Sequence, residues 1–244
     1  MHAQRGLKKP ARRALPGAFG PSEDQGGALT EEPRVRRLGR VAYNMAWRSM
    51  MDYTAARDAL TPDELWICEH PPVYTLGQAG KPEHRLYDNG IPLVRSDRGG
   101  QITYHGPGQA VIYLLLDLAR RKLSVHELVW RIEQSVIDFL AAHAIAARRF
   151  PGAPGVYVRK NGAIAKIAAL GLRVRRRCCY HGLSLNVDMD ISPFLAINPC
   201  GYAGMAVTRT KDLGMESNAS EAAEALAARL IAWLSQTQRE GNAG

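Results

Sequence analysis

The segment from Arg98 to Gln109 constrains this chain more than any other part of its sequence. It reads RGGQITYHGPGQ and holds four glycines and a proline. Glycine lets the backbone adopt positive φ angles and lets a ligand approach the main chain closely. A simple turn needs only about two or three such residues. Because the apolar run from Ala110 to Leu118 follows directly, we expect a ligand-binding loop held in place by a buried strand.

Lys166 lies in an apolar stretch, AKIAALG, where a charged amine is unexpected. In a strand it would share a face with Ile164 and Ala168. A lysine on an edge strand can keep its amine in water while its stem is buried. A desolvated lysine can instead exchange protons near neutral pH. Both interpretations stay open at this point.

Cys200 lies between Pro199 and Gly201, in a tight turn that can project a side chain into a cleft. Most cysteines are inert and pack as small apolar groups, and we expect this of Cys68, which lies in an apolar segment. Cys178 and Cys179 follow a basic run whose charge can lower a thiol pKa. They therefore remain weaker candidates for a nucleophile. The four cysteines match no zinc-binding spacing and no disulfide framework, which favours a reducing compartment.

Taken together, these segments resemble the lipoyl(octanoyl) transferases. Two further segments carry the same resemblance, EHPPVYTLG at Glu69–Gly77 and HGLSLNV at His181–Val187. Five ordered motifs thus extend from about residue 64 to residue 204. The resemblance implies the biotin/lipoate protein ligase catalytic fold. It also implies an enzyme that transfers an octanoyl group and begins protein lipoylation.

The resemblance gives roles to individual residues. Cys200 would be the nucleophile that carries the octanoyl group as an acyl thioester. Lys166 would lower the pKa of that cysteine and act as acid and base. The resemblance implies no cofactor, and the histidine spacing indicates no metal site. The segments that match substrate-binding segments of the family contain Arg98, Gly99, Gly100, Gln101, Ile102, Thr103, Tyr104, His105, Ala169, Leu170, Gly171, Gly182, Leu183 and Ser184.

The partners that the resemblance implies are acidic proteins. Octanoyl-acyl carrier protein would be the donor. The acceptors would be lipoyl domains of 2-oxoacid dehydrogenase E2 subunits and the glycine cleavage H protein. A net charge of +9 fits acidic partners. Basic chains often bind nucleic acid, but only 7% of residues are aromatic and no stacking pattern is present. We therefore expect neither nucleic-acid nor membrane binding.

Other functions remain to be separated from this one. An ATP-dependent lipoate or biotin protein ligase would share the fold but would need no acyl-enzyme cysteine. A non-catalytic acyl-carrier or nucleic-acid binding protein would be supported by the basic charge alone. Within the enzyme hypothesis, a Cys–His pair is the alternative activation scheme. His70, His105 and His181 each lie beside a matched motif, and His105 is the strongest candidate for substrate contact.

The pattern along the chain indicates a flexible extension over residues 1–34 and one catalytic domain over residues 35–244. Helices are predicted over 43–59 and over 220–234. A third helix is predicted to begin at Ser124, because Ser124 and Glu127 have the spacing of a capping box. Strands are predicted at 65–68, 73–76, 91–95, 110–116, 155–158, 163–170 and 180–187. Helices and strands without strict alternation indicate an α+β, mixed α/β class. No apolar run reaches the ~20 residues of a membrane span, so we expect a soluble, cytoplasmic protein.

Overall fold

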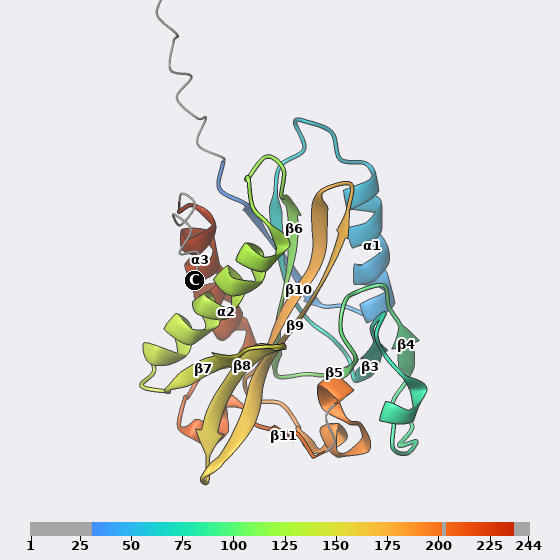
Figure 1. Ribbon diagram of the computed structural model, residues 1–244, viewed down its shortest axis with the longest axis vertical. Helices are drawn as coiled ribbons and strands as arrows, with labels where there is room; N and C mark the ends of the chain where they lie inside the picture. The colour runs from blue at the N-terminus through green and yellow to red at the C-terminus, as the bar shows by residue number, and fades with distance from the viewer. Residues whose placement is uncertain (1–30, 202–203, 237–244) are drawn as a thin grey trace, which may run out of the picture.

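The computed structural model describes residues 31–201 and 204–236, except the side chain of Cys200 (Figure 1). Most of the expected extension, residues 1–30, lies outside this range. Three α-helices, four short 3₁₀ helices and eleven strands are present in the described part of the chain. Their bounds are β1 Arg34–Arg40, α1 Tyr43–Ala55, β2 Glu64–Glu69, β3 Val73–Leu76, β4 Leu93–Arg95, β5 Ile102–His105, β6 Gln109–Asp117, α2 Val125–Ala141, β7 Ala147–Phe150, β8 Ala153–Lys160, β9 Ala163–Arg175, β10 Cys178–Asn186, β11 Ala206–Val207 and α3 Ala219–Leu234.

The strands form two sheets. The large sheet has the order β1-β2-β6-β10-β9-β8-β7, and β11 pairs with β9. Most of its pairs are antiparallel, but β1 runs parallel to β2 and β11 runs parallel to β9. The small sheet has the order β4-β3-β5. Mixed sheets with packed helices confirm the expected fold class.

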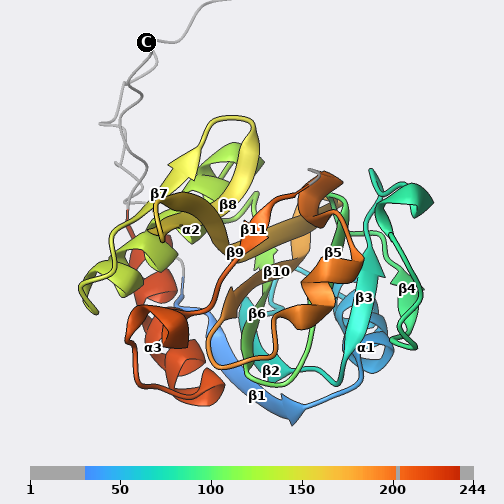
Figure 2. The same ribbon diagram turned by 90° about the horizontal axis from the view of Figure 1, so that it is seen from below.

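The helices cover both faces of the large sheet. Helices α2 and α3 lie on one side, whereas α1 and the small sheet lie on the other (Figures 1 and 2). The main core lies between the sheet and α2 and α3, where Leu128, Ile132 and Leu226 are buried. A second cluster packs Met50 of α1 against the opposite face. No helix in the described ranges is long and apolar enough to cross a membrane.

Helix α2 begins as its sequence indicates. The Ser124 side chain accepts a hydrogen bond from the Glu127 backbone N–H at 3.1 Å. The return bond of a capping box is not made, because the Glu127 carboxylate accepts from Arg131 Nε at 2.9 Å. The apolar stripe is buried from Ile132 to Leu140 and at Leu128, half-buried at Val129, and 43% exposed at its first position, Val125. One end of the predicted stripe therefore faces water.

The structure differs from the sequence-based prediction within the glycine-rich segment, at the end of α1 and at three strands that were not predicted. The segment is not one long loop, since Ile102–His105 forms β5 and pairs with β3. Strand β1 was not predicted, because its sequence, RVRRLGR, lacks a buried face. Helix α1 ends at Ala55 rather than near residue 59. Strands β7 and β11 were also missed, and both are short.

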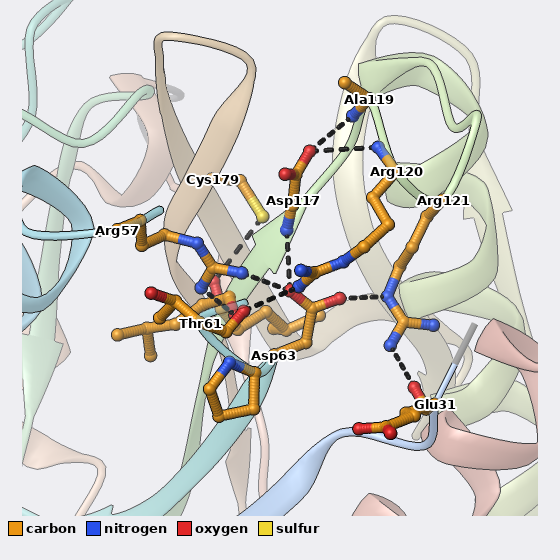
Figure 3. A network of polar contacts seen from close by, with 12 residues as sticks. Glu31, Arg57, Thr61, Asp63, Asp117, Ala119, Arg120, Arg121 and Cys179 are labelled. Carbon is orange, nitrogen blue, oxygen red and sulfur yellow. Dashed lines mark hydrogen bonds and ion pairs between the residues drawn. The ribbon is translucent and has the colours of Figure 1, made fainter. Parts of the chain in front are cut away.

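Asp63 anchors one end of the large sheet through three arginines (Figure 3). Its carboxylate pairs with Arg57, with Arg120 at 2.7 Å and with Arg121 at 2.5 Å. It also accepts the backbone N–H of Asp117 at 2.8 Å. Asp63, Arg57 and Arg121 have almost no exposed side-chain surface. This network joins the end of α1, the start of β2 and the end of β6.

Replacing Asp63 by asparagine is expected to destabilise the protein by about 3–5 kcal/mol, because removing one partner leaves buried charges without compensation. Chemical denaturation at neutral pH measures the change. Asp88→Asn is the matched control, since Asp88 pairs with Arg85 but is 78% exposed. The control should change stability by less than about 1 kcal/mol. Equal effects of the two substitutions would contradict a structural role for the network.

Candidate active site

A pocket lies between the large sheet and the small sheet. Strands β9 and β10 supply its floor, and the segment around β5 supplies the opposite wall. Residues of α1 and β6 complete it. The lining residues are Tyr43, Arg98, Gln101, Ile102, Thr103, His105, Val111, Tyr113, Ala169, Leu170, Gly171, His181, Gly182, Leu183 and Ser184. Most of this surface is hydrocarbon or glycine, which suits an acyl chain.

The Arg98 side chain turns inward and fastens the glycine-rich segment. Its guanidinium donates to the carbonyls of Thr75 at 2.6 Å, Gly99 at 2.8 Å and Gln101 at 2.8 Å. It also donates to Thr75 Oγ1. Arg98 therefore fixes the path of this segment as well as lining the pocket.

The neighbouring backbones approach so closely that side chains would not fit. A Cβ atom at Gly77 would lie 2.4 Å from the Gly100 carbonyl oxygen. A Cβ atom at Gly171 would lie 2.9 Å from the Gly99 carbonyl oxygen. The Gly99 N–H in turn donates to the Leu172 carbonyl at 2.9 Å. Glycine is therefore needed here to bring the segment against β9.

Of the residues expected from the sequence to bind substrate, most line this pocket. Gly99, Gly100 and Tyr104 do not. The two glycines shape the backbone behind the pocket. Tyr104 is buried and packs against Tyr74 and Phe194 in a separate cluster.

The sequence-based prediction missed several pocket residues. Tyr43, Val111 and Tyr113 line the pocket, yet they lie in an ordinary amphipathic helix and an ordinary apolar strand. No local signal distinguishes them from core residues. His181 was noted beside a motif but was not included among the substrate-binding residues. Only the packing of α1 and β6 against the pocket reveals the first three.

Lys166 lies in β9, inside the sheet, and is only 4% exposed. The interpretation of an edge-strand lysine with its amine in water is therefore wrong. Its Nζ donates to the Pro154 carbonyl at 2.9 Å and lies 5.2 Å from the centre of the Tyr157 ring. Lys166 and Pro199 line a second pocket. This second pocket shares Thr103, Ala169 and Ser184 with the first.

Cys200 lies in a single 3₁₀ turn, Pro199–Gly201. Gly201 follows with a φ of +77°, which a side chain at that position would disfavour. Because Pro199 lines the pocket that also contains Lys166, the turn lies next to the lysine. The Cys200 side chain lies outside the described part of the chain, so its contact with Lys166 stays a prediction.

The other three cysteines are buried and unreactive in character. Burial raises the pKa of the Cys178 thiol and raises that of Cys179 to about 12. Burial also raises the pKa of Cys68 strongly. A raised pKa leaves little thiolate at neutral pH. The basic run before Cys178 and Cys179 therefore does not activate them.

Three histidines surround the pocket, and burial lowers the pKa of each, for His105 to about 3. His70 bonds to the Val41 carbonyl and to the Tyr113 hydroxyl, both at 2.6 Å. His105 Nδ1 lies 2.7 Å from Gln109 Oε1, and His181 Nε2 lies 2.9 Å from an Asp97 carboxylate oxygen. These side chains are neutral at physiological pH.

The buried histidines should make the protein sensitive to acid. The pKa of His105 is lower in the folded state than in the unfolded chain, so below pH 6.5 the unfolded chain binds more protons. The contribution of neutral His105 to the free energy of unfolding is fully present above about pH 6.5, and it is lost as the pH falls towards 3. We expect His105 alone to cost about 5 kcal/mol over that range.

Denaturant unfolding at several pH values between 7 and 4 checks this expectation. His126→Gln is a control because His126 is exposed on α2, and it should leave the slope unchanged. A stability that stays constant from pH 7 to pH 4 would contradict the burial of neutral histidines.

Comparison with known proteins identifies the family. The model of the lipoyl protein ligase A/B catalytic domain matches residues 40–231. The octanoyltransferase of Dechloromonas aromatica is 65% identical over 204 residues, which cover 84% of this chain and 98% of that protein. The octanoyltransferase of Laribacter hongkongensis is 57% identical over 209 residues, which cover 86% and 99%. The chain therefore belongs to the lipoyl protein ligase A/B catalytic domain family, which confirms the resemblance seen in its motifs.

Solved structures show the same fold at low identity. Lipoate-protein ligase A bound with ATP superposes with a TM-score of 0.67 and 18% identity, covering 86% of this chain and 89% of that one. The bi-partite lipoate protein ligase of Thermoplasma acidophilum superposes with a TM-score of 0.66 and 17% identity, covering 86% of each chain. These likenesses confirm the fold alone. The activity is inferred from the octanoyltransferases of higher identity.

Proposed function

We propose that this chain is an octanoyltransferase that moves an octanoyl group from a thioester donor to a protein lysine, through an acyl-enzyme on Cys200. The observation that carries the activity is the 65% and 57% identity to octanoyltransferases over nearly their whole length. The pocket supports the same conclusion, because its apolar walls lead to Lys166 and Pro199.

In the first half-reaction, the Cys200 thiolate attacks the thioester carbonyl of the donor. The new sulfur–carbon bond replaces the bond to the donor thiol, which leaves with a proton. Lys166 takes the proton from Cys200 and supplies one to the leaving group. One thioester is exchanged for another, so no ATP is consumed.

In the second half-reaction, the ε-amine of the acceptor lysine attacks the octanoyl-Cys200 thioester. An amide bond forms, the Cys200 sulfur leaves, and the amine loses a proton that Lys166 can accept. Amide formation from a thioester is downhill, which makes transfer effectively irreversible. The order is ping-pong, as covalent catalysis requires.

The pocket between the sheets would hold the acyl chain. Burying about six methylene groups at ~0.8 kcal/mol each contributes roughly 5 kcal/mol. Small residues, Ala169 and Gly171 on β9 and Gly182 on β10, leave room for the chain. Shorter acyl groups would lose part of this burial and should transfer less well.

In the proposed reaction, acyl carrier protein is the donor and lipoyl domains are the acceptors. We further propose octanoyl-acyl carrier protein as the specific donor. The specific acceptors would be the E2 subunits of 2-oxoacid dehydrogenases and the glycine cleavage H protein, with the reaction in the cytoplasm. The net charge of +9 would attract acidic carriers.

An ATP-free transfer assay tests the proposal. The full chain is mixed with octanoyl-acyl carrier protein and an isolated lipoyl domain, without nucleotide. Intact-mass measurement should show octanoylated lipoyl domain and, without acceptor, one octanoyl group on the enzyme. Transfer that requires ATP and free octanoate would instead establish a ligase and overturn the proposal.

A further inference from the structure

A single peptide group separates Lys166 from a buried carboxylate. The Lys166 Nζ donates to the carbonyl oxygen of Pro154 at 2.9 Å. The N–H of the same peptide, which belongs to Gly155, donates to Glu133 Oε1 at 2.9 Å. The chain of contacts therefore runs from the Glu133 carboxylate through one peptide to the Lys166 ammonium.

Glu133 lies on α2, outside the predicted catalytic motifs, and is 5% exposed. Its other oxygen lies 3.3 Å from Arg149 Nε of β7. Burial raises the pKa of this carboxyl group, whereas the Gly155 N–H, Arg149 and Lys166 each lower it. Glu133 and Lys166 are thus close enough to interact electrostatically, as well as through the peptide between them.

Gly155 is the residue that permits this arrangement. Its φ is +135°, a conformation that other residues rarely adopt. A Cβ atom there would lie 2.5 Å from Lys166 Cε and 2.9 Å from Nζ. The peptide therefore packs directly against the end of the lysine side chain.

We propose that Glu133 is a positioning residue that acts through the Pro154–Gly155 peptide to hold the Lys166 ammonium in place beside the pocket. A carboxylate on the N–H side polarises a peptide and strengthens hydrogen bonding at its carbonyl. The inference rests on the proposed role of Lys166 in catalysis. It explains why a carboxylate is buried on a helix that contributes nothing to the pocket wall.

Several described groups interact with Lys166. Among them, Glu133 is the one that carries a negative charge. The Tyr157 ring from β8 faces Nζ. Arg149 from β7 pairs with the Glu133 oxygen that does not accept the Gly155 N–H. The other polar residues around the second pocket are neutral: Thr103, Gln109, Ser184 and Asn186. A change of charge at position 133 should therefore change the electrostatic stabilisation of the Lys166 ammonium.

Two substitutions separate charge from geometry. Glu133→Gln keeps an oxygen that accepts the Gly155 N–H but removes the charge. Glu133→Ala removes both. Glu64→Gln is the matched control, because Glu64 is also a buried carboxylate with an arginine partner at 3.3 Å, but lies on β2. Each variant is assayed for acyl-enzyme formation with octanoyl-acyl carrier protein across pH, after its fold is checked by circular dichroism.

We expect the Glu133→Gln variant to move the basic limb of the pH–rate profile to lower pH by about one pH unit. Without the carboxylate, a positive charge beside the Pro154–Gly155 peptide is less stabilised. Glu133→Ala should in addition lower the maximal rate about 100-fold, as displaced catalytic groups do. The Glu64→Gln control should keep the wild-type profile.

Failure of this inference can be told apart from failure of the proposed function. If Lys166→Ala slows acylation and the folded Glu133→Gln and Glu133→Ala variants both keep the wild-type rate and pH profile, Glu133 has no positioning role. If Lys166→Ala itself acylates at the wild-type rate, the proposed role of the lysine is wrong and the inference falls with it. A Glu133→Gln variant that loses rate at every pH equally also overturns the inference, because a purely structural defect shifts no limb.

Discussion

Replacing Cys200 by serine is expected to abolish the acyl-enzyme and the overall transfer of the octanoyl group. A serine hydroxyl stays protonated at neutral pH where a thiol can ionise. Intact-mass measurement after incubation with octanoyl-acyl carrier protein should show one octanoyl group on the wild type and none on the variant. We expect the loss of steady-state transfer to reach at least ~10⁴-fold, since the nucleophile itself is removed.

Cys178→Ser is the matched control for the Cys200 variant. Cys178 is buried at the start of β10, and burial raises the pKa of its thiol. The control should form the octanoyl adduct and transfer it as the wild type does. An adduct that persists on Cys178 or Cys179 in the Cys200→Ser variant, with transfer intact, would refute the choice of nucleophile.

Local patterns predicted the elements whose burial is regular along the chain. The apolar stripe from Leu128 to Leu140 gives α2, and the run after Gln109 gives β6. The motifs on β9 and β10 pointed to the pocket floor through their resemblance to substrate-binding segments of the family. In each case the information lies within about ten neighbouring residues.

Other features depend on contacts between distant segments, and local patterns do not show them. Strand β1 is rich in arginine and becomes a strand only because β2 pairs with it. Tyr43 becomes a pocket residue through the packing of α1 on the sheet. Glu133 lies 33 positions before Lys166 in sequence, and the Pro154–Gly155 peptide of β8 links the two in the folded chain. Such relations need the folded chain.

Replacing Lys166 by alanine is expected to slow both half-reactions by about 10²–10⁴-fold, because each requires proton transfer at Cys200 or at the attacking amine. The buried position of Lys166, with its amine bonded to the Pro154 carbonyl, fits a fixed catalytic group. Single-turnover measurements separate the two steps, using octanoyl-acyl carrier protein for the first and preformed acyl-enzyme with a lipoyl domain for the second.

The control for Lys166→Ala is Lys160→Ala, in the neighbouring strand β8. Lys160 pairs with Asp212 at 2.6 Å near the surface, and its loss should leave both rates unchanged. Thermal unfolding must show that the Lys166 variant is folded at the assay temperature. If that folded variant transfers the octanoyl group at the wild-type rate, the lysine is structural, and His105, which lines the pocket, becomes the next candidate for the acid and base. A slow first step with a normal second step would restrict Lys166 to activation of the cysteine.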